Sequence, residues 1–356
     1  HVLTIEKHPG ADKLNKTTVD IGNGTILNIV CGAPNVDAGQ KVIVAPVGTV
    51  LYSDEGSFEI KKAKIRGEAS EGMICGEDEI GLGSDKSGIM VLDSSLTPGT
   101  PLTDIYKVET DHQLEIAIIP NRGDAISHMG VARELQALTG EKYRKPSIES
   151  IDARGQMRVD VSIGDARATP RYSGITITGV EIKESPDWLK KRIQSIDLKP
   201  INNVVDITNF IQHEIGQPLH AFDYSRLSGN KIVARYAKQG EKLTTLDEVE
   251  RELTEKHLII ADADKPLALA GVLGGIDSGV TSSTSTIFIE SAYFNPAAVR
   301  KTAKSFGLNT DASYRFERGT DPEMVSFALT RAVNLILKEA GGEVASEVVD
   351  VYPEII

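Results

Sequence analysis

The sequence contains little cysteine, a single tryptophan and no long apolar run. Cys31 and Cys75 are the only cysteines among 356 residues, which excludes a disulfide framework and a zinc site made of cysteines alone, and is typical of a reducing compartment. No segment approaches the roughly 20 apolar residues that cross a bilayer. The first residues, HVLTIEKHPG, lack the basic-then-apolar order of a secretory signal. We therefore expect a cytoplasmic protein with no membrane partner. Because the chain begins at His1 rather than at methionine, we also expect a piece of a longer protein.

Positive charge is also scarce, since the formal net charge is -12. Most proteins this acidic bind no nucleic acid, so any such function depends on local patches. Two basic patches occur, KKAKIRG at 61–67 and LKKR at 189–192. The cations of the first are Lys61, Lys62, Lys64 and Arg66. Taken alone, either patch is more often a solvated face than a nucleic-acid site.

The pattern of apolar residues predicts several domains. With 40% hydrophobic and 25% charged residues, the chain is long enough for two or three cores. The first hundred residues alternate short apolar runs with glycine and Asx turns, which indicates a small closed or partly open β-barrel. SSLTPGTPL at 94–102 is expected to be the linker that follows. A helix is predicted at 126–139, with Asp124 as its cap.

The second half of the chain is predicted to be mixed α and β. RYSGITITGVEI alternates as a strand does, and SPDWLKKRIQSID is typical of a helix with a serine cap and an early proline. Further strands are expected near 203–207, 231–236, 257–261 and 286–290. FALTRAVNLILKEAGG predicts an amphipathic helix that its glycine pair terminates.

Five polar clusters lie in this half: DITNF around Asn209, GQPLHAFD around His220, ALAGVLGGIDSG at 268–279, FIESAYF around Glu290, and NTDASYRFERG at 309–319. Each is a weak signal alone. A lone histidine is more often structural than catalytic, and His220 has no second histidine at metal-ligand spacing. GVLGG is not a Walker loop, although its glycines allow a ligand to approach the backbone closely.

Glu290 is the most unusual of these residues, because it ends the apolar strand TIFIE. A buried carboxylate needs a partner, since an unpaired charge is costly to remove from water. The partner is either an arginine, Arg300, Arg315 or Arg318, or a hydroxyl or ammonium group of a ligand. The sequence leaves both interpretations open.

Eight motifs in one order resemble a known family across essentially the whole chain. They are HPGADKL, IVCGAPNV, IRGEASEGMICGEDEIGL, IPNRGDAISHMGVARELQAL, VVDITNF, GQPLHAFD, LAGVLGGIDSGV and NTDASYRFERGTDP. Together they closely resemble the β subunit of bacterial phenylalanyl-tRNA synthetase, in its N-terminal half. The resemblance implies a multidomain chain: a tRNA-binding OB-type β-barrel at 1–105, a small helical segment at 106–150 and an α+β editing domain at 151–356.

The same resemblance implies the roles of particular residues. Asn209 and His220 would be catalytic, and Glu290 would accept a hydrogen bond from the hydroxyl of a tyrosine substrate. Thr310, Ala312, Gly271, Gly274 and Gly275 would contact that substrate, and the cations of the 61–67 patch would contact tRNA. No metal is implied at this site. The expected partners are tRNA(Phe) and the synthetase α subunit in an α2β2 enzyme. ATP and Mg²⁺ would serve the complete enzyme, with no cofactor in this piece.

The chemistry of editing explains why a carboxylate would be needed. A pocket shaped for phenylalanine rejects tyrosine by only about a hundredfold, so a second site must recognise the hydroxyl. Phenylalanine would leave the carboxylate unpaired, at a cost of roughly 1 to 3 kcal/mol. No Ser-His-Asp or Cys-His arrangement is recognised in the sequence, which favours attack on the ester by a positioned water. Backbone amides near Gly274, Gly275 and Ala312 would stabilise the oxyanion.

Two other classes of function stay open at this stage. The chain is either an RNA-binding module that only places tRNA, with a structural second domain, or a metal-dependent hydrolase that uses His220, Asp223 and Glu290. An RNA-binding module should not hydrolyse Tyr-tRNA(Phe). A metal-dependent hydrolase should lose its activity with a chelator.

Overall fold

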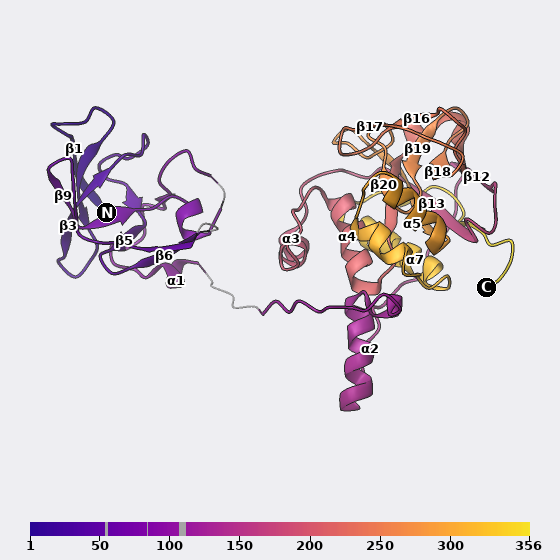
Figure 1. Ribbon diagram of the computed structural model, residues 1–356. Helices are drawn as coiled ribbons and strands as arrows, with labels where there is room; N and C mark the ends of the chain where they lie inside the picture. Colours follow the sequence, from indigo (N-terminus) through magenta and orange to yellow (C-terminus); the bar gives the residue numbers. More distant parts are fainter. Residues whose placement is uncertain (54–55, 84, 107–111) are drawn as a thin grey trace. The chain divides into compact units, whose positions relative to one another are not determined.

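The computed structural model describes residues 1–53, 56–83, 85–106 and 112–356. By contacts between Cα atoms, the chain divides into two compact units, His1–His112 and Gln113–Ile356 (Figure 1). The sequence had placed the first boundary after residue 105. None of the described helices is long and apolar enough to span a bilayer.

The first unit consists of short strands. β1 (Val2–Lys7), β2 (Asn15–Asp20) and β3 (Ile26–Cys31) form an antiparallel sheet in that order. The other strands pair two by two: β4 (Lys41–Val42) with β11 (Val91–Leu92), β5 (Val44–Pro46) with β10 (Gly72–Ile74), β6 (Val50–Ser53) with β7 (Gly56–Glu59), and β8 (Ala63–Ile65) with β9 (Glu68–Ser70). The unit also contains two single-turn helices, η1 (Asp78–Ile80) between β10 and β11, and α1 (Leu102–Ile105) after β11. The predicted short strands are present, but the ladders between the described strands do not close into a barrel.

Helix α2 (His128–Thr139) begins where the sequence predicted a helix, but with a different cap. The Ser127 hydroxyl accepts a hydrogen bond from the Gly130 amide at 2.9 Å. The predicted cap, Asp124, is wrong, because this residue lies in the separate 3-10 turn η2 (Gly123–Ala125) and pairs with Arg122. Met129 packs in the same apolar cluster as α4 (Asn203–Ile215). The helix therefore belongs to the second unit.

A five-stranded antiparallel sheet lies at the centre of the second unit. Its strands are β14 (Leu219–Asp223), β21 (Thr286–Tyr293), β13 (Arg171–Thr178) and β22 (Glu343–Val344) in that order, with β23 (Val349–Val351) also on β13. Ile175 and Ile177 of β13 and Ile287 and Ile289 of β21 pack against α4 and α7 (Met324–Glu339). These two helices cover one face of the sheet (Figure 1), and α3 (Asp187–Gln194) packs on α4.

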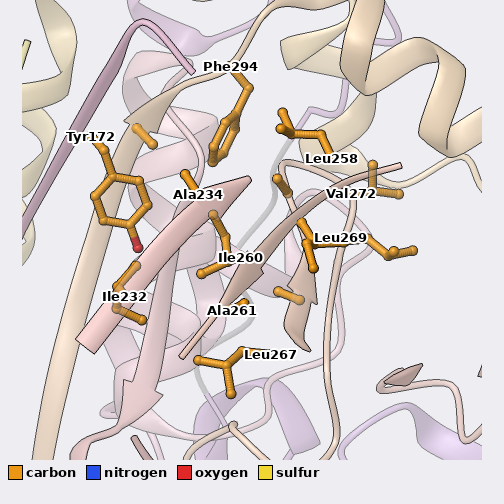
Figure 2. Packing of buried hydrophobic residues seen from close by; sticks show 14 of the residues in the cluster. Tyr172, Ile232, Ala234, Leu258, Ile260, Ala261, Leu267, Leu269, Val272 and Phe294 are labelled. Carbon is orange, nitrogen blue, oxygen red and sulfur yellow. The ribbon is translucent and has the colours of Figure 1, made fainter. Parts of the chain in front are cut away.

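A second sheet covers the other face. Its strands are β12 (Asp160–Ile163), β15 (Lys231–Tyr236), β18 (Leu258–Ala261), β19 (Pro266–Leu269) and β20 (Leu273–Gly274), with only β12 and β15 parallel. The elements around it are β16 (Lys242–Thr244), β17 (Glu250–Glu252), η3 (Tyr224–Arg226), η4 (Ser228–Asn230), α5 (Pro296–Ser305) and α6 (Asp311–Phe316). Its apolar side chains join Tyr172, Phe222 and Phe288 of the first sheet in one cluster, part of which Figure 2 shows. Residues on this face of β21 therefore lie in a largely apolar interior.

Two local predictions in this unit are wrong for a physical reason. The strand expected near 203–207 is the start of α4, which Asn202 caps by accepting from the amides of Val204 and Val205. The β-branched run favours a strand by propensity, but burial at Val204, Ile207 and Ile211 follows the helical period, and packing decides. Ser185 does not cap α3, because its hydroxyl donates to Asp206 at 2.5 Å. The predicted strands near 171–178, 231–236, 257–261 and 286–290 and the C-terminal helix are confirmed.

Candidate functional site

A cavity of about 420 Å³ brings together most of the residues singled out from the sequence. Its lining comes from α4, β14, β19, β20, β21 and α6, which are far apart in the chain. The lining includes seven of the predicted site residues: Asn209, His220, Gly271, Gly274, Glu290, Thr310 and Ala312. Gly275 is not among the described lining residues. Its amide donates to the Leu267 carbonyl at 2.8 Å, so it is already used within the sheet.

Strand register fixes the centre of this site. Glu290 of β21 lies opposite His220 of β14 on one side and opposite Gly174 of β13 on the other. Directly opposed residues of an antiparallel pair project from the same face of the sheet. Glu290 and His220 therefore both project toward the second sheet, away from α4 and α7.

Glu290 has a partner that the sequence did not reveal. The Tyr172 hydroxyl donates to Glu290 Oε2 at 2.5 Å, and Tyr172 is fully buried while Glu290 is 7% exposed. The two residues are 118 positions apart in the chain. None of the expected arginines bonds to Glu290 among the described contacts. The groups they contact are Glu317 for Arg300, Asp311 and His213 for Arg315, and Tyr314 and Glu317 for Arg318.

The surroundings hold the Glu290 carboxyl near its point of titration at neutral pH. Burial raises the pKa of Glu290 to about 7, while the hydrogen bond from Tyr172 acts in the opposite direction. Burial, and secondly the neighbouring Glu290, raise the pKa of Tyr172 well above its ordinary value, so the phenol keeps its proton. A small change in this pair therefore decides whether the carboxyl is charged.

His220 is a neutral imidazole in this site. Burial lowers the pKa of His220 to about 4, and its buried Nε2 atom has no hydrogen-bond partner among the described residues. Its ring packs edge-on against Phe222, with 4.5 Å between ring centroids. A Cβ at Gly274 would lie 2.7 Å from His220 Cε1. Glycine is therefore required at 274 to accommodate this ring.

Asn209 and Thr310 differ in what their side chains can offer a ligand. The Asn209 amide lines the cavity from α4 and has no side-chain partner among the described hydrogen bonds. Thr310 is the N-cap of α6, and its hydroxyl accepts from the Ser313 amide at 3.1 Å and donates to the Val272 carbonyl at 2.7 Å. The Thr310 hydroxyl thus joins α6 to the turn before β20, and its part in holding the wall is structural.

The polar stretch at 309–319 bonds mainly to itself and to α4. Arg315 is 5% exposed and donates to the Asp311 carbonyl at 2.8 Å and to His213 Nδ1 at 3.1 Å. Asp311 Oδ2 lies 3.8 Å from His213 Nε2. These contacts hold α6, and with it Ala312, at the edge of the cavity. Sequence reasoning missed His213, because its spacing from Arg315 in the chain carries no signal.

The cations of the 61–67 patch are exposed but not all free. Lys61, Lys62, Lys64 and Arg66 lie on or beside the β8–β9 hairpin, where Arg66 and Gly67 form the turn with φ of 49° and 98°. Lys62 pairs with Glu71 at 2.7 Å. The acidic neighbours therefore reduce the positive potential of this surface.

The described residues contain no group of three histidine, cysteine or acidic side chains placed to hold a metal ion. Of the residues named for the metal-dependent alternative, Asp223 accepts hydrogen bonds from the Ser225 amide at 2.9 Å and from Thr284 at 2.7 Å. The Asp223 carboxylate is therefore occupied by protein partners.

Comparison with known proteins identifies both units of the chain. Residues 1–101 match the family described as a putative tRNA binding domain, and residues 168–341 match the B3/4 domain. A putative tRNA binding domain followed by a B3/4 domain defines the class of protein to which this chain belongs. Phenylalanine–tRNA ligase beta subunits are similar along nearly the whole chain: that of Bacteroides thetaiotaomicron is 49% identical over 356 residues, and that of Porphyromonas gingivalis 51% over 358. The chain belongs to the family of phenylalanine–tRNA ligase β subunits.

The two alignments include 98% and 99% of this chain, but only 43% and 44% of the two relatives. It thus spans less than half of the curated relatives it matches. The β subunit of Salinibacter ruber is 45% identical over 365 residues, with 99% of this chain and 44% of the relative covered. A crystal structure of an N-terminal fragment of the phenylalanyl-tRNA synthetase beta-subunit from Pyrococcus horikoshii matches 67% of this chain and 65% of its own, at 19% identity and a TM-score of 0.39.

Proposed function

We propose that this chain binds tRNA(Phe) and hydrolyses tyrosine that has been attached to it in error. The observation that carries this proposal is the buried carboxyl of Glu290 in the wall of a 420 Å³ cavity, with Asn209 and His220 beside it. A carboxylate in an apolar pocket discriminates between tyrosine and phenylalanine, because only tyrosine supplies a hydroxyl to it. The name of the family supplies phenylalanine, and tyrosine, which differs from it by one hydroxyl, is the amino acid that such a site would have to separate from it.

The contact with Tyr172 supports a phenol as the group that Glu290 recognises. Its hydroxyl donates to Oε2 within the protein, so the carboxyl already binds the functional group that distinguishes tyrosine from phenylalanine. A substrate hydroxyl would donate to the other oxygen from the cavity side. A phenylalanine ring would bring no donor and would leave that oxygen dehydrated, at a cost of roughly 1 to 3 kcal/mol.

The hydrolysis itself uses a positioned water. The water oxygen attacks the ester carbonyl carbon, and the bond from that carbon to the terminal ribose oxygen breaks. One proton of the water goes to the ribose oxygen, the other is released to solvent, and tyrosine leaves as a carboxylate. His220, with a pKa of about 4, is a weak base at neutral pH. We therefore assign His220 and Asn209 to holding the water or the ester and ribose oxygens. The Ala312 amide, in the first turn of α6, is a donor for the developing oxyanion.

The remaining parts of the proposal concern the first unit and the complete enzyme. We assign the first unit to tRNA binding through its exposed cations, with its strands arranged as in an OB-type barrel. The synthetase α subunit is the expected partner, in an α2β2 enzyme in the cytoplasm. ATP and Mg²⁺ would act at the synthetic site, and no step of the hydrolysis described here uses them.

Deacylation of Tyr-tRNA(Phe) and Phe-tRNA(Phe), with and without EDTA, tests the proposal. We expect the tyrosyl ester to be hydrolysed faster, with no effect of the chelator. Glu290→Ala should lower the tyrosyl rate roughly ten- to a hundredfold, the equivalent of one charge-assisted hydrogen bond, and leave the phenylalanyl rate equal or higher. Glu252→Ala, at an exposed position on β17, is the matched control. If neither ester is hydrolysed, the chain is an RNA-binding module. If EDTA abolishes the hydrolysis, the chain is a metal-dependent hydrolase.

A further inference from the structure

The geometry points to Tyr172 as the residue that sets the specificity of this site without touching the substrate: its hydrogen bond favours the charged form of Glu290 and leaves the other carboxyl oxygen facing the cavity. This inference rests on the proposed function. Tyr172 is not among the described residues that line the cavity, whereas Glu290 is. Tyr172 is therefore a positioning residue, which acts on a substrate only through Glu290.

The sheet is built to bring these two side chains together. Tyr172 lies opposite Ala292, and Glu290 lies two residues before Ala292 in β21, so the pair is a diagonal one on a single face. The residue opposite Glu290 is Gly174, where a Cβ would lie 2.2 Å from the Phe288 ring. Because Gly174 has no side chain, the Phe288 ring packs over it, while the Tyr172 hydroxyl reaches Glu290 diagonally. Figure 2 shows the Tyr172 ring within the apolar cluster that includes Ile232 and Ala234 of β15.

The hydrogen bond uses only one carboxyl oxygen. Tyr172 donates to Oε2 at 2.5 Å, and no other described hydrogen bond or ion pair involves Glu290. Glu290 Oε1 is not among the fully enclosed polar atoms, and Glu290 lines the cavity. The fixed oxygen thus orients the second oxygen toward the space that a substrate side chain would enter.

Few other titratable groups lie near enough to affect the charge of the Glu290 carboxyl. The titratable side chains that line the same cavity are His220 from β14 and Asp311 from α6. His220 is neutral because burial lowers its pKa to about 4, and Asp311 is engaged with His213 and Arg315. No described cation pairs with Glu290. The Tyr172 hydroxyl is therefore the one described group that bonds to the charged form of Glu290, and a hydrogen bond to a charged form favours it.

Removing this hydroxyl should convert Glu290 to a neutral acid at physiological pH. A neutral carboxyl can donate as well as accept, so it no longer requires a hydroxyl from the substrate. Tyr172→Phe should raise the titration midpoint of Glu290 by roughly one to two pH units. The ratio of tyrosyl to phenylalanyl deacylation should fall about tenfold at pH 7 and recover toward that of the unmodified protein near pH 9.

The experiment has a readout that does not depend on activity. The chain is labelled with glutamate ¹³C at the side-chain carboxyl, and the Glu290 signal is assigned by its loss in Glu290→Gln. The signal is then titrated in the unmodified protein, in Tyr172→Phe and in the control Tyr293→Phe, a half-buried tyrosine of the same sheet. We expect the midpoint to rise only in Tyr172→Phe. Both deacylation rates are measured over the same pH range, with the spontaneous reaction subtracted.

The outcomes separate this inference from the proposed function. An unchanged Glu290 midpoint, or a selectivity that falls equally at all pH values, overturns the role of Tyr172 while the editing function stands. A shifted midpoint in a protein that hydrolyses neither ester overturns the proposed function and, with it, the role in specificity. Should Tyr172→Phe fail to fold, 3-fluorotyrosine at position 172, a stronger donor, should shift the midpoint downward. No shift in that protein is equally decisive against the inference.

Discussion

Glu290 illustrates, at the scale of one residue, how burial changes the meaning of a side chain. At the protein surface, a glutamate is charged at neutral pH and its contribution is small. At 7% exposure, with one phenol as its partner, it titrates near neutrality. In the proposed function, the same environment would make it selective for a hydroxyl. It also makes the charged form costly, so the proposed function and stability oppose each other at this position.

This opposition predicts a pH dependence of stability. The folded-state pKa of Glu290, about 7, lies above the ordinary value of 4.5, so between these pH values the folded protein keeps a proton that the unfolded chain has released. Glu290 therefore favours folding at low pH, and this contribution is lost as the pH rises through 7. Relative to Glu290→Gln, the unmodified protein should lose on the order of 3 kcal/mol of unfolding free energy between pH 4.5 and 8. Urea unfolding at several pH values measures this, and a constant difference would contradict it.

His220 should not titrate in the physiological range, because burial lowers its pKa to about 4. Glu290→Gln removes the carboxyl that titrates near pH 7, so in this background the rate of Tyr-tRNA(Phe) hydrolysis should be flat between pH 5.5 and 8. His220→Asn should lower this rate without changing the shape of the profile. A midpoint near 6.5 that disappears in His220→Asn would instead identify His220 as a general base.

At the scale of an element, α6 shows how a short helix is held by its capping residue. Thr310 caps α6 by accepting from the Ser313 amide and also donates to the Val272 carbonyl. Thr310→Ala should therefore lower the unfolding free energy by about 1 to 2 kcal/mol, and Thr310→Ser should retain most of it. Thermal unfolding measures both. A folded Thr310→Ala protein of unchanged stability but impaired hydrolysis would show that the hydroxyl serves the substrate instead.

At the scale of the whole molecule, the net charge of -12 opposes RNA binding, and the patch at 61–67 has to overcome it. Replacing Lys61, Lys62, Lys64 and Arg66 by alanine should weaken tRNA(Phe) binding and flatten its salt dependence by about one unit of log-log slope for each phosphate that the protein no longer neutralises. Lys62, paired with Glu71, should contribute less than Lys61 or Lys64. Filter binding at several salt concentrations tests this.

The matched control removes the same number of charges by replacing four exposed lysines of the second unit, Lys238, Lys256, Lys265 and Lys301, by alanine. This variant should change neither the affinity nor the slope. Equal effects of both variants would mean that net charge rather than the patch governs binding, and no effect of either would place the RNA contacts elsewhere.

The sequence by itself determined which residues are chemically unusual and where most strands and helices lie. The alternation of β13, the apolar run that ends in Glu290, and the glycine pair after α7 are local signals, and local physics generates them. The start of α4 was misread because its β-branched run favours a strand, whereas the buried spacing of Val204, Ile207 and Ile211 favours a helix only once α7 and the sheet are in place.

Only the tertiary structure decided what the unusual residues contact. The partner of Glu290 is Tyr172 rather than any of three arginines, and strand register selects it across 118 positions. Gly275, predicted beside the substrate, has its amide in a strand hydrogen bond, while Thr310 holds a helix cap. A sequence pattern shows that a carboxylate will be buried. Which donor reaches it depends on the pairing of distant strands, and that pairing is set by the burial of two sheets and the helices against each other.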